Sequence, residues 1–251
     1  MAVDVLNTDL CAIIPTYNNA GTIRQVIEDV ARHCRHIIVV NDGCTDNTSQ
    51  ILDQIEIPVD IVTYGQNRGK GYALVKGFQR AKELGFSLAL TIDADGQHFA
   101  DDIPLFISKY QDSPTGIIVG CRNLNEENMP RQNTFANRFS NFWFRIQTGI
   151  NLPDTQSGFR LYTLSALRGM SLITSRYEAE LEFLVFAAWA GATISSVNVR
   201  VYYPPAEKRV THFRPVYDFF RISVLNTVLC IGAICYGWPC VLMRKLRRRF
   251  I

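Results

Sequence analysis

The chain has 251 residues, of which 47% are hydrophobic, so it is long enough for one large α/β domain with an appendage. Its net charge of +3 is unevenly distributed, because residues 215–251 contain six basic residues and one acidic residue, whereas residues 1–214 carry −2. A basic tail on a slightly acidic domain argues against nucleic acid as a partner of that domain.

The first two-thirds of the chain alternates apolar strands with amphipathic helices. Short apolar runs predict strands at residues 10–14, 36–40, 59–63, 87–92 and 116–119. Helical spacing predicts helices at residues 20–32, 46–54 and 71–84 and from Asp101 or Asp102 onward, the second of them capped by Asp46. These β-α-β units predict a doubly wound, mostly parallel α/β sheet with helices on both faces, within a domain of residues 1–214.

Polar clusters follow four of the predicted strands. They are Pro15 to Asn19, Asn41 to Gly43, Gln66 to Gly71, and Asp93 to Asp95. Ligands bind at the carboxyl ends of strands in such a sheet, so the four clusters are expected to line one crevice. Tyr17 can stack on a base, and Asp42 can accept hydrogen bonds from a base or a ribose. Lys70, among glycines, can meet a phosphate.

The central predicted strand ends at two carboxylates. Asp93 and Asp95 point to the same side of an extended segment, and carboxylates are ligands that hard divalent cations prefer. A plain polar turn is the alternative for this short sequence, but the coincidence of four clusters favours a binding site. The glycine-containing loop lacks Walker A spacing, and no Gly-x-Gly-x-x-Gly follows the first strand. This disfavours an NTPase and a nicotinamide dehydrogenase.

Five motifs in chain order resemble those of family 2 glycosyltransferases with the glycosyltransferase-A fold. They are Ile13 to Asn18, Val40 to Asp46, Asn67 to Gly71, Asp93 to His98, and Ser157 to Arg160. The most similar branch contains dolichyl-phosphate mannosyltransferase and bacterial polyprenyl-phosphate glycosyltransferases. The resemblance implies an inverting, metal-dependent transfer of a sugar from a nucleotide-diphosphate donor to a membrane lipid phosphate.

The resemblance also implies roles for individual residues. Asp42 corresponds to the family's base-binding aspartate, and Asp93, Asp95 and Gln97 correspond to the set that coordinates Mg²⁺ or Mn²⁺. The expected donor-binding residues are Pro15, Tyr17, Asn18, Asp42, Asn67, Lys70, Asp93 and Arg209. Asn41 and Asn19 stand where the family usually has aspartate and often has glutamate. The donor base, uridine or guanosine, therefore stays open.

Residues 121–160 combine arginines with aromatic residues. The spacing predicts a helix from Phe135 to Ile146 with an apolar face and a basic flank, for which ordinary packing against the sheet is the alternative. Guanidinium groups suit phosphate oxygens, and the aromatic residues could face a lipid chain. By resemblance, the expected acceptor-phosphate residues are Arg122, Arg131, Arg138, Ser157 and Arg160.

The acceptor decides whether a general base is needed. A lipid phosphate already carries nucleophilic oxygens, whereas a lipid hydroxyl, the alternative acceptor, requires a carboxylate base such as Asp154 or Glu180. Glu180 has a second interpretation as an acid favoured by a helix N-terminus. The candidate catalytic residues are Asp95, Asp154, Ser157, Arg160 and Glu180. A sugar nucleotidyltransferase and a noncatalytic nucleotide-binding membrane protein are the competing classes.

Cysteine usage and the N-terminus indicate the compartment. The seven cysteines include no Cys-x-x-Cys pair, which fits free thiols in a reducing environment better than a disulfide framework or a zinc site. The first residues lack the pattern of a signal peptide. The domain is therefore expected at the cytoplasmic face of a membrane, the inner membrane if the source is bacterial. Nothing indicates the oligomeric state.

The C-terminal segment predicts membrane contact. Residues 200–214 are expected to form a mobile loop in which Arg209 resembles the family's basic residue that closes on the donor diphosphate, with His212 beside it. Residues 222–243 then form a run of 22 residues without charge before a basic cluster at 244–249. A single crossing would place this cluster outside, against the positive-inside tendency. We therefore expect residues 215–251 to form a monotopic anchor, with residues 216–229 in the interface and a kink or hairpin near Gly237.

Overall fold

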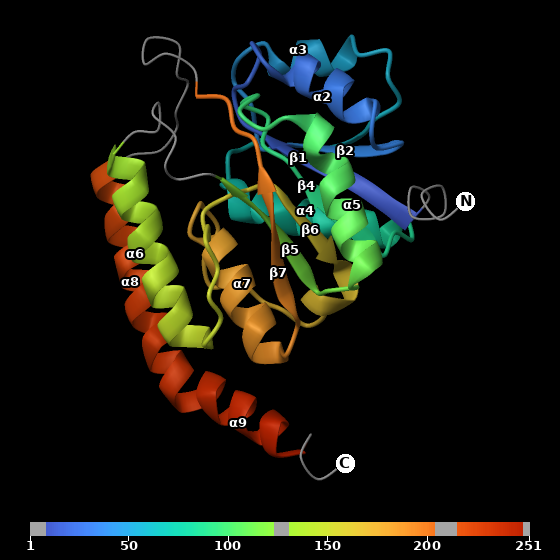
Figure 1. The fold of residues 1–251 in the computed structure, drawn as a ribbon. Coiled ribbons are helices and arrows are strands. Elements are labelled where there is room, and N and C mark those ends of the chain that lie inside the picture. Colours follow the sequence, from blue (N-terminus) through green and yellow to red (C-terminus); the bar gives the residue numbers. More distant parts are fainter. Residues whose placement is uncertain (1–8, 123–130, 204–214, 248–251) are drawn as a thin grey trace.

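A seven-stranded mixed sheet forms the centre of the computed structural model, which describes residues 9–122, 131–203 and 215–247 (Figure 1). The strand order is β3-β2-β1-β4-β6-β5-β7. The strands are β1 (Leu10–Thr16), β2 (His36–Asn41), β3 (Asp60–Thr63), β4 (Leu88–Thr91), β5 (Ile117–Arg122), β6 (Arg160–Thr163) and β7 (Ile194–Val199). All neighbouring pairs are parallel except those of β6, which runs antiparallel to β4 and to β5.

The five strands with predicted bounds are confirmed, each to within a few residues at its ends. Strand β6 was not predicted, because it has only four residues and three of them are buried, so it shows no alternation of apolar and polar positions. Its antiparallel pairing places Arg160 opposite Thr91 of β4. The residues that follow β4 and those that precede β6 therefore lie at the same edge of the sheet.

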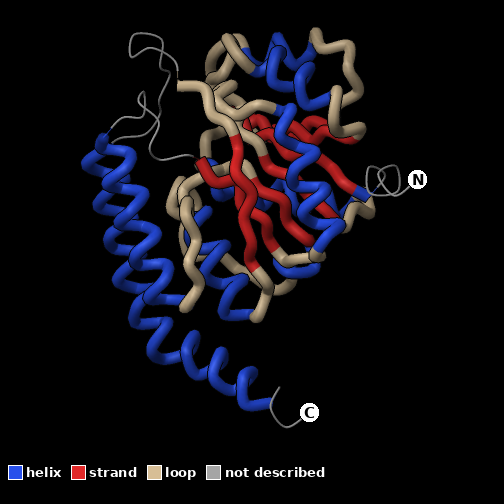
Figure 2. The backbone as a smooth tube through the Cα atoms, in the orientation of Figure 1, coloured by secondary structure: helices blue, strands red, loops and turns tan. Residues whose placement is uncertain are grey.

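Helices cover both faces of the sheet, as the β-α-β pattern predicts (Figure 2). One face packs against α2 (Ile23–Ala31), α3 (Thr48–Asp53) and α5 (Ile103–Asp112), and the other against α4 (Lys70–Glu83), α6 (Arg131–Thr148) and α7 (Ala179–Ala190). Two separate apolar cores result, one on each side of the sheet. The N-cap position of α3 is Asn47 and not Asp46 as predicted, although Asp46 accepts a hydrogen bond from the Thr48 N–H at 3.0 Å.

The C-terminal segment is helical and packs on the domain. Helix α8 (Pro215–Gly232) continues through a π-helical turn (Ala233–Gly237) into α9 (Trp238–Arg247), and α9 leaves the line of α8 (Figure 1). Pro239 has no N–H to donate, which accounts with the π-turn for the bend. We predicted a kink or a hairpin near Gly237. The structure has the kink, and the chain does not reverse. Gln147 of α6 donates to Asn226 of α8 at 3.0 Å, so the tail is tied to the domain.

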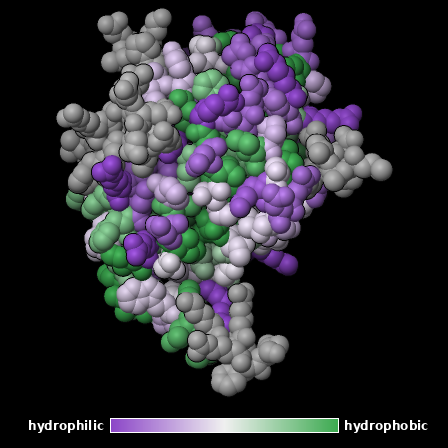
Figure 3. Space-filling view, viewed as in Figure 1, coloured by the Kyte–Doolittle hydropathy of each residue, from purple (hydrophilic) through white to green (hydrophobic). Residues whose placement is uncertain are grey.

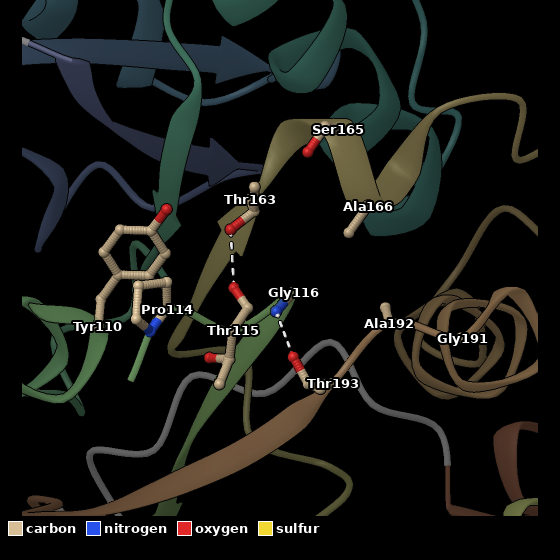
Figure 4. A pocket seen from close by; sticks show the side chains of 10 residues that line it. All are labelled: Tyr110, Pro114, Thr115, Gly116, Thr163, Ser165, Ala166, Gly191, Ala192 and Thr193. Atoms are coloured by element: carbon tan, nitrogen blue, oxygen red, sulfur yellow. Dashed lines mark hydrogen bonds between the residues drawn. The ribbon is translucent and has the colours of Figure 1, made fainter. Parts of the chain in front are cut away.

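A cavity of about 300 Å³ lies where β5 and β7 begin, at the end of the sheet opposite the polar clusters (Figure 4). Its lining residues are uncharged. Thr163 donates to the Thr115 carbonyl at 2.7 Å, and the Gly116 N–H donates to Thr193 at 3.1 Å. These polar groups hold the strand ends together, and we assign no ligand to the cavity.

Candidate active site

Asp42 fixes the glycine-containing loop at the carboxyl end of β2. Its Oδ1 accepts the Arg68 N–H at 2.7 Å and its Oδ2 accepts the Gly69 N–H at 2.9 Å. Gly69 has a φ of 96°, a left-handed conformation that favours glycine. Each carboxylate oxygen retains a further lone pair, so Asp42 can still accept hydrogen bonds from a ligand.

The loops after β1 and β2 are joined through Asn18. The Asn18 Oδ1 accepts the Thr45 N–H at 2.8 Å, and Asn18 itself adopts a left-handed φ of 55°. Pro15 is buried within β1, and Tyr17 and Asn67 are half-buried beside it in the loops that follow β1 and β3. The predicted donor residues therefore gather at one edge of the sheet, apart from Arg209, which lies outside the described residues.

Lys70 links three elements at the centre of this edge. Its Nζ lies 2.6 Å from Asp93 Oδ1, after β4, and 3.0 Å from Glu180 Oε2, in the first turn of α7. Burial opposes the charge of Lys70, but the carboxylates of Asp93 and Glu180 outweigh it and raise its pKa above the ordinary value. The sequence predicted Lys70 as a phosphate ligand and did not indicate that it joins these two acids.

Asp95 is the second carboxylate of the pair, and its Oδ1 accepts the Gln97 N–H at 3.0 Å. Burial and the charge of Asp93 raise the pKa of Asp95 to about 6. Among the described residues, no group of three or more His, Cys, Asp or Glu side chains is arranged to hold a metal. Two carboxylates with open positions nevertheless fit Mg²⁺, which proteins commonly bind through one or two carboxylates and the phosphates of a substrate.

His98 belongs to the same cluster, although the sequence suggested no role for it. Its Nδ1 is buried and has no hydrogen-bond partner among the residues that the structure describes. Burial lowers the pKa of His98 to about 4, so the ring is neutral at pH 7. Its ring packs on Phe159, with the centroids 5.2 Å apart.

Gly158 leaves the space that the Lys70–Asp93 ion pair occupies. A Cβ at this position would lie 2.5 Å from Asp93 Oδ2 and 2.5 Å from Lys70 Nζ. We therefore predict that Gly158→Ala separates the pair and lowers catalytic turnover about 100-fold, since a displacement of about 1 Å has effects of this size. Gly65→Ala is the matched control, because a Cβ there meets nothing within 4 Å. Equal turnover of the two variants would contradict the prediction.

Arg122 and Asp154 form a buried ion pair on the acceptor side. The Arg122 Nε and Nη2 donate to Asp154 at 2.6 and 3.0 Å, and Asn137 of α6 donates to the same carboxylate at 2.5 Å. Burial raises the pKa of Asp154, but the hydrogen bonds and charge of Arg122 outweigh it and hold the pKa below its usual range. The Asp154 side chain is 0% exposed. A buried, ion-paired carboxylate is disfavoured as a general base, and the catalytic role of Asp154 stays a prediction.

The Arg160 guanidinium donates its hydrogen bonds mainly to the protein backbone. Its guanidinium donates to the backbone carbonyls of Ser157, Thr155 and Glu180 at 2.7, 2.9 and 2.7 Å. The side chain is fully buried. The guanidinium donors are directed at the protein itself in this structure, so a contact of Arg160 with an acceptor phosphate stays a prediction.

The other expected acceptor residues separate in space. Ser157 is buried, and its Oγ accepts the Phe159 N–H at 3.4 Å. Arg138 is exposed on α6. The side chain of Arg131 lies outside the described residues. Among the expected acceptor arginines of the described residues, Arg138 is thus exposed, whereas the side chain of Arg122 is 16% exposed and is paired with Asp154.

The sequence did not predict that the polar side of α6 forms hydrogen bonds with the loop before β6. Asn141 accepts the Thr155 N–H at 2.9 Å, and Ser140 accepts a hydrogen bond from the Thr155 hydroxyl at 2.7 Å. Together with Asn137, these residues hold the loop that carries Asp154 and Ser157. Asn137 and Asn141 are one helical turn apart, a spacing that could have indicated a shared polar partner.

Comparison with known proteins agrees with this geometry. The family model described as glycosyl transferase family 2 matches residues 11–170. UDP-N-acetylglucosamine--dolichyl-phosphate N-acetylglucosaminyltransferase of Methanococcus voltae is 33% identical over 212 residues, which cover 76% of this chain and 84% of that protein. Polyprenol monophosphomannose synthase of Mycolicibacterium smegmatis is 26% identical over 169 residues, covering 64% and 63% of the two chains.

A solved structure shares the fold. Glucosyl-3-phosphoglycerate synthase from Mycobacterium tuberculosis, in complex with Mn²⁺, uridine diphosphate and phosphoglyceric acid, superposes with a TM-score of 0.67. The match covers 92% of this chain and 82% of that chain, with 17% sequence identity. At this identity the likeness concerns the fold alone.

Proposed function

This chain belongs to glycosyl transferase family 2, and from that premise we propose that it transfers a sugar from a nucleotide-diphosphate donor to the phosphate of a membrane polyprenyl lipid. The observation that carries the proposal is the contact of Lys70 with Asp93 at the carboxyl edge of the sheet, two residues before Asp95. Two relatives whose names contain dolichyl phosphate or polyprenol monophosphomannose support the acceptor class.

The proposed reaction is a direct displacement. An oxygen of the lipid phosphate attacks the anomeric carbon, the bond from that carbon to the donor diphosphate breaks, and the nucleoside diphosphate leaves with the electron pair. The anomeric centre is thereby inverted. Because a phosphate oxygen is already ionised at neutral pH, this acceptor does not require a carboxylate base. The buried ion pair of Asp154 weakens the alternative of a hydroxyl acceptor, for which Glu180, paired with Lys70, is the other candidate base.

The proposed cofactor is Mg²⁺ or Mn²⁺, held by Asp93 and Asp95 with Gln97 nearby. When bound, the ion would neutralise charge on the departing diphosphate. Lys70 adds a positive charge beside Asp93, and Asp42 keeps the loop that carries Lys70 in place. The solved neighbour with Mn²⁺ and uridine diphosphate supports a divalent metal, whereas the donor base stays a choice between uridine and guanosine.

Release of nucleoside diphosphate tests the proposal. The detergent-purified protein with Mn²⁺ is mixed with uridine- and guanosine-linked sugars, with and without polyprenyl phosphate. Release that requires the lipid phosphate is the expected result and identifies the donor. Release that requires instead a lipid without phosphate would overturn the proposed acceptor and make Glu180→Gln the next variant.

The tail is proposed to lie in the membrane interface at the cytoplasmic face. Figure 3 shows hydrophobic residues along the side of the molecule that α6 and the tail form. The large apolar side chains exposed on the tail are Phe220, Val224, Val228, Ile231, Ile234, Tyr236, Trp238, Leu242, Met243 and Leu246. Arg244 and the basic residues after it suit an anionic lipid surface.

A monotopic arrangement suits this tail better than a span. Within the described residues, one segment, Phe220–Arg244, is long and apolar enough to cross a membrane. One face of this segment packs on the domain, however. Trp189 packs against Gly237, and Arg244 donates to the Ala188 carbonyl at 3.3 Å. This packing along the catalytic domain supports a tail that lies in the membrane surface over one along the membrane normal.

Protease protection distinguishes the two arrangements. We predict that a C-terminal tag on the chain resists protease added outside sealed right-side-out vesicles and is removed after detergent opens them. The physical reason is that both the domain and the basic cluster stay on the inner side. Removal of the tag from intact vesicles would show a crossing and contradict the prediction.

A further inference from the structure

Helix α8 has two adjacent faces with different surroundings. Phe220, Val224 and Val228 recur at a spacing of four residues and are exposed, with Phe220 at 65%. Leu225 and Leu229 are buried in the core that α6 and α7 share. Arg221 lies one turn before Leu225 and therefore begins the buried face. The face of α8 that is proposed to contact lipid is thus adjacent to the face that carries Arg221.

Arg221 forms an ion pair with a buried carboxylate of the catalytic domain. Its Nε donates to Glu178 Oε1 at 2.9 Å, and its Nη2 contacts the same oxygen. The Glu178 side chain is only 1% exposed. Its Oε2 has no hydrogen-bond partner among the residues described. A buried carboxylate needs a nearby cation, and a residue of the tail supplies it here.

Glu178 lies at the start of α7, next to the centre of the candidate site. Its carbonyl accepts the N–H groups of Leu181 and Glu182 at 3.1 and 3.2 Å, so it begins the first turn of the helix. Glu180, in that turn, contacts Lys70. A Cβ on Gly71 would lie 2.3 Å from the Ala179 Cβ, so this turn also packs tightly on the start of α4.

We infer that Arg221 is a positioning residue for sugar transfer. Its ion pair with Glu178 fixes the first turn of α7 and thereby holds Glu180 and Lys70 against Asp93. The inference rests on the proposed function, and it makes the tail a part of the active-site architecture as well as an anchor. Tail and catalytic carboxylates are connected through two ion-paired contacts, Arg221 to Glu178 and Glu180 to Lys70.

A single and a double variant separate the effect of Arg221 on turnover from its effect on stability. Arg221→Met leaves the Glu178 charge buried and unpaired, so both the melting temperature and the turnover should fall. In the double variant Arg221→Met/Glu178→Gln no charge is stranded, so the melting temperature should recover. Turnover should stay about ten-fold below wild type with KM for the donor little changed, because the first turn of α7 is no longer fixed. Recovery of turnover together with the melting temperature would overturn the inference.

A second readout does not depend on transfer activity. Amide hydrogen exchange at residues 179–182 should be faster in the double variant than in wild type, and Arg80→Met serves as the control. Arg80 pairs with Asp60 on the surface of α4, so its loss should leave this exchange unchanged. Absence of nucleoside diphosphate release in wild type would reject the proposed function, whereas unchanged exchange in the double variant would reject the positioning role of Arg221.

Discussion

Replacing Asp95 with asparagine is expected to lower sugar transfer on the order of 1000-fold while leaving the fold at least as stable as wild type. Burial and the negative charge of Asp93 raise the pKa of Asp95 to about 6, so its ionised form is unfavourable in the protein alone. Asparagine removes that repulsion and keeps an oxygen for the Gln97 N–H. It also removes one of the two carboxylates proposed to hold the metal. Nucleoside diphosphate release and the melting temperature measure the two effects.

The matched control is Asp101→Asn. Asp101 lies six residues further along the same region of the chain, its side chain is 65% exposed, and it pairs with His33 on the surface. Its replacement should change neither turnover nor the melting temperature appreciably, since exposed pairs contribute little. Wild-type turnover in Asp95→Asn would remove Asp95 from the reaction, whereas absence of turnover in wild type itself would favour a noncatalytic nucleotide-binding protein.

The sequence predicted that the donor-side polar clusters lie at one edge of the sheet, because the information for this arrangement is local. Each polar cluster directly follows an apolar run, and the parallel strands bring Asp42, Lys70 and Asp93 to one edge without knowledge of distant contacts. The glycosyltransferase-A fold and family membership followed from the same motifs. The expectation of Lys70 beside phosphate stays a prediction, although its two carboxylate partners are now known.

The acceptor side was predicted less well because it depends on pairing between distant segments. Arg122 and Asp154 are 32 residues apart, and a sequence shows their charges but not that each one neutralises the other in the interior. Arg160 similarly looks available until the antiparallel strand β6 buries it. The packing of the tail on α6 and α7 has no local signature either, since residues 222–243 would show the same apolar run in a free anchor.

The Arg122–Asp154 pair gives the largest expected effect on stability. We predict that Arg122→Met lowers the free energy of unfolding by about 3–5 kcal/mol, because it strands the Asp154 carboxylate in the interior. Chemical denaturation of the purified variant at pH 7 measures the loss. The double variant Arg122→Met/Asp154→Asn should recover most of it, since no buried charge remains, whereas Arg80→Met, at a pair near the surface, should change the free energy of unfolding little.

The stability deficit of Arg122→Met should also change with pH, in a direction that the pKa of Asp154 determines. In wild type the pKa of Asp154 is below its unfolded value, so its contribution to stability is present above the unfolded pKa and is lost as pH falls through the folded pKa. Without the Arg122 side chain, burial of Asp154 is opposed only by the hydrogen bonds from Asn137 and from backbone N–H groups such as that of Gln156, so the pKa of Asp154 is higher than in wild type. The folded variant then binds more protons than folded wild type, so lowering the pH from 7 toward the unfolded pKa should narrow its stability deficit relative to wild type. A deficit that stays constant over this range would mean that Asp154 is rehydrated in the variant and that the pair is not sealed from water.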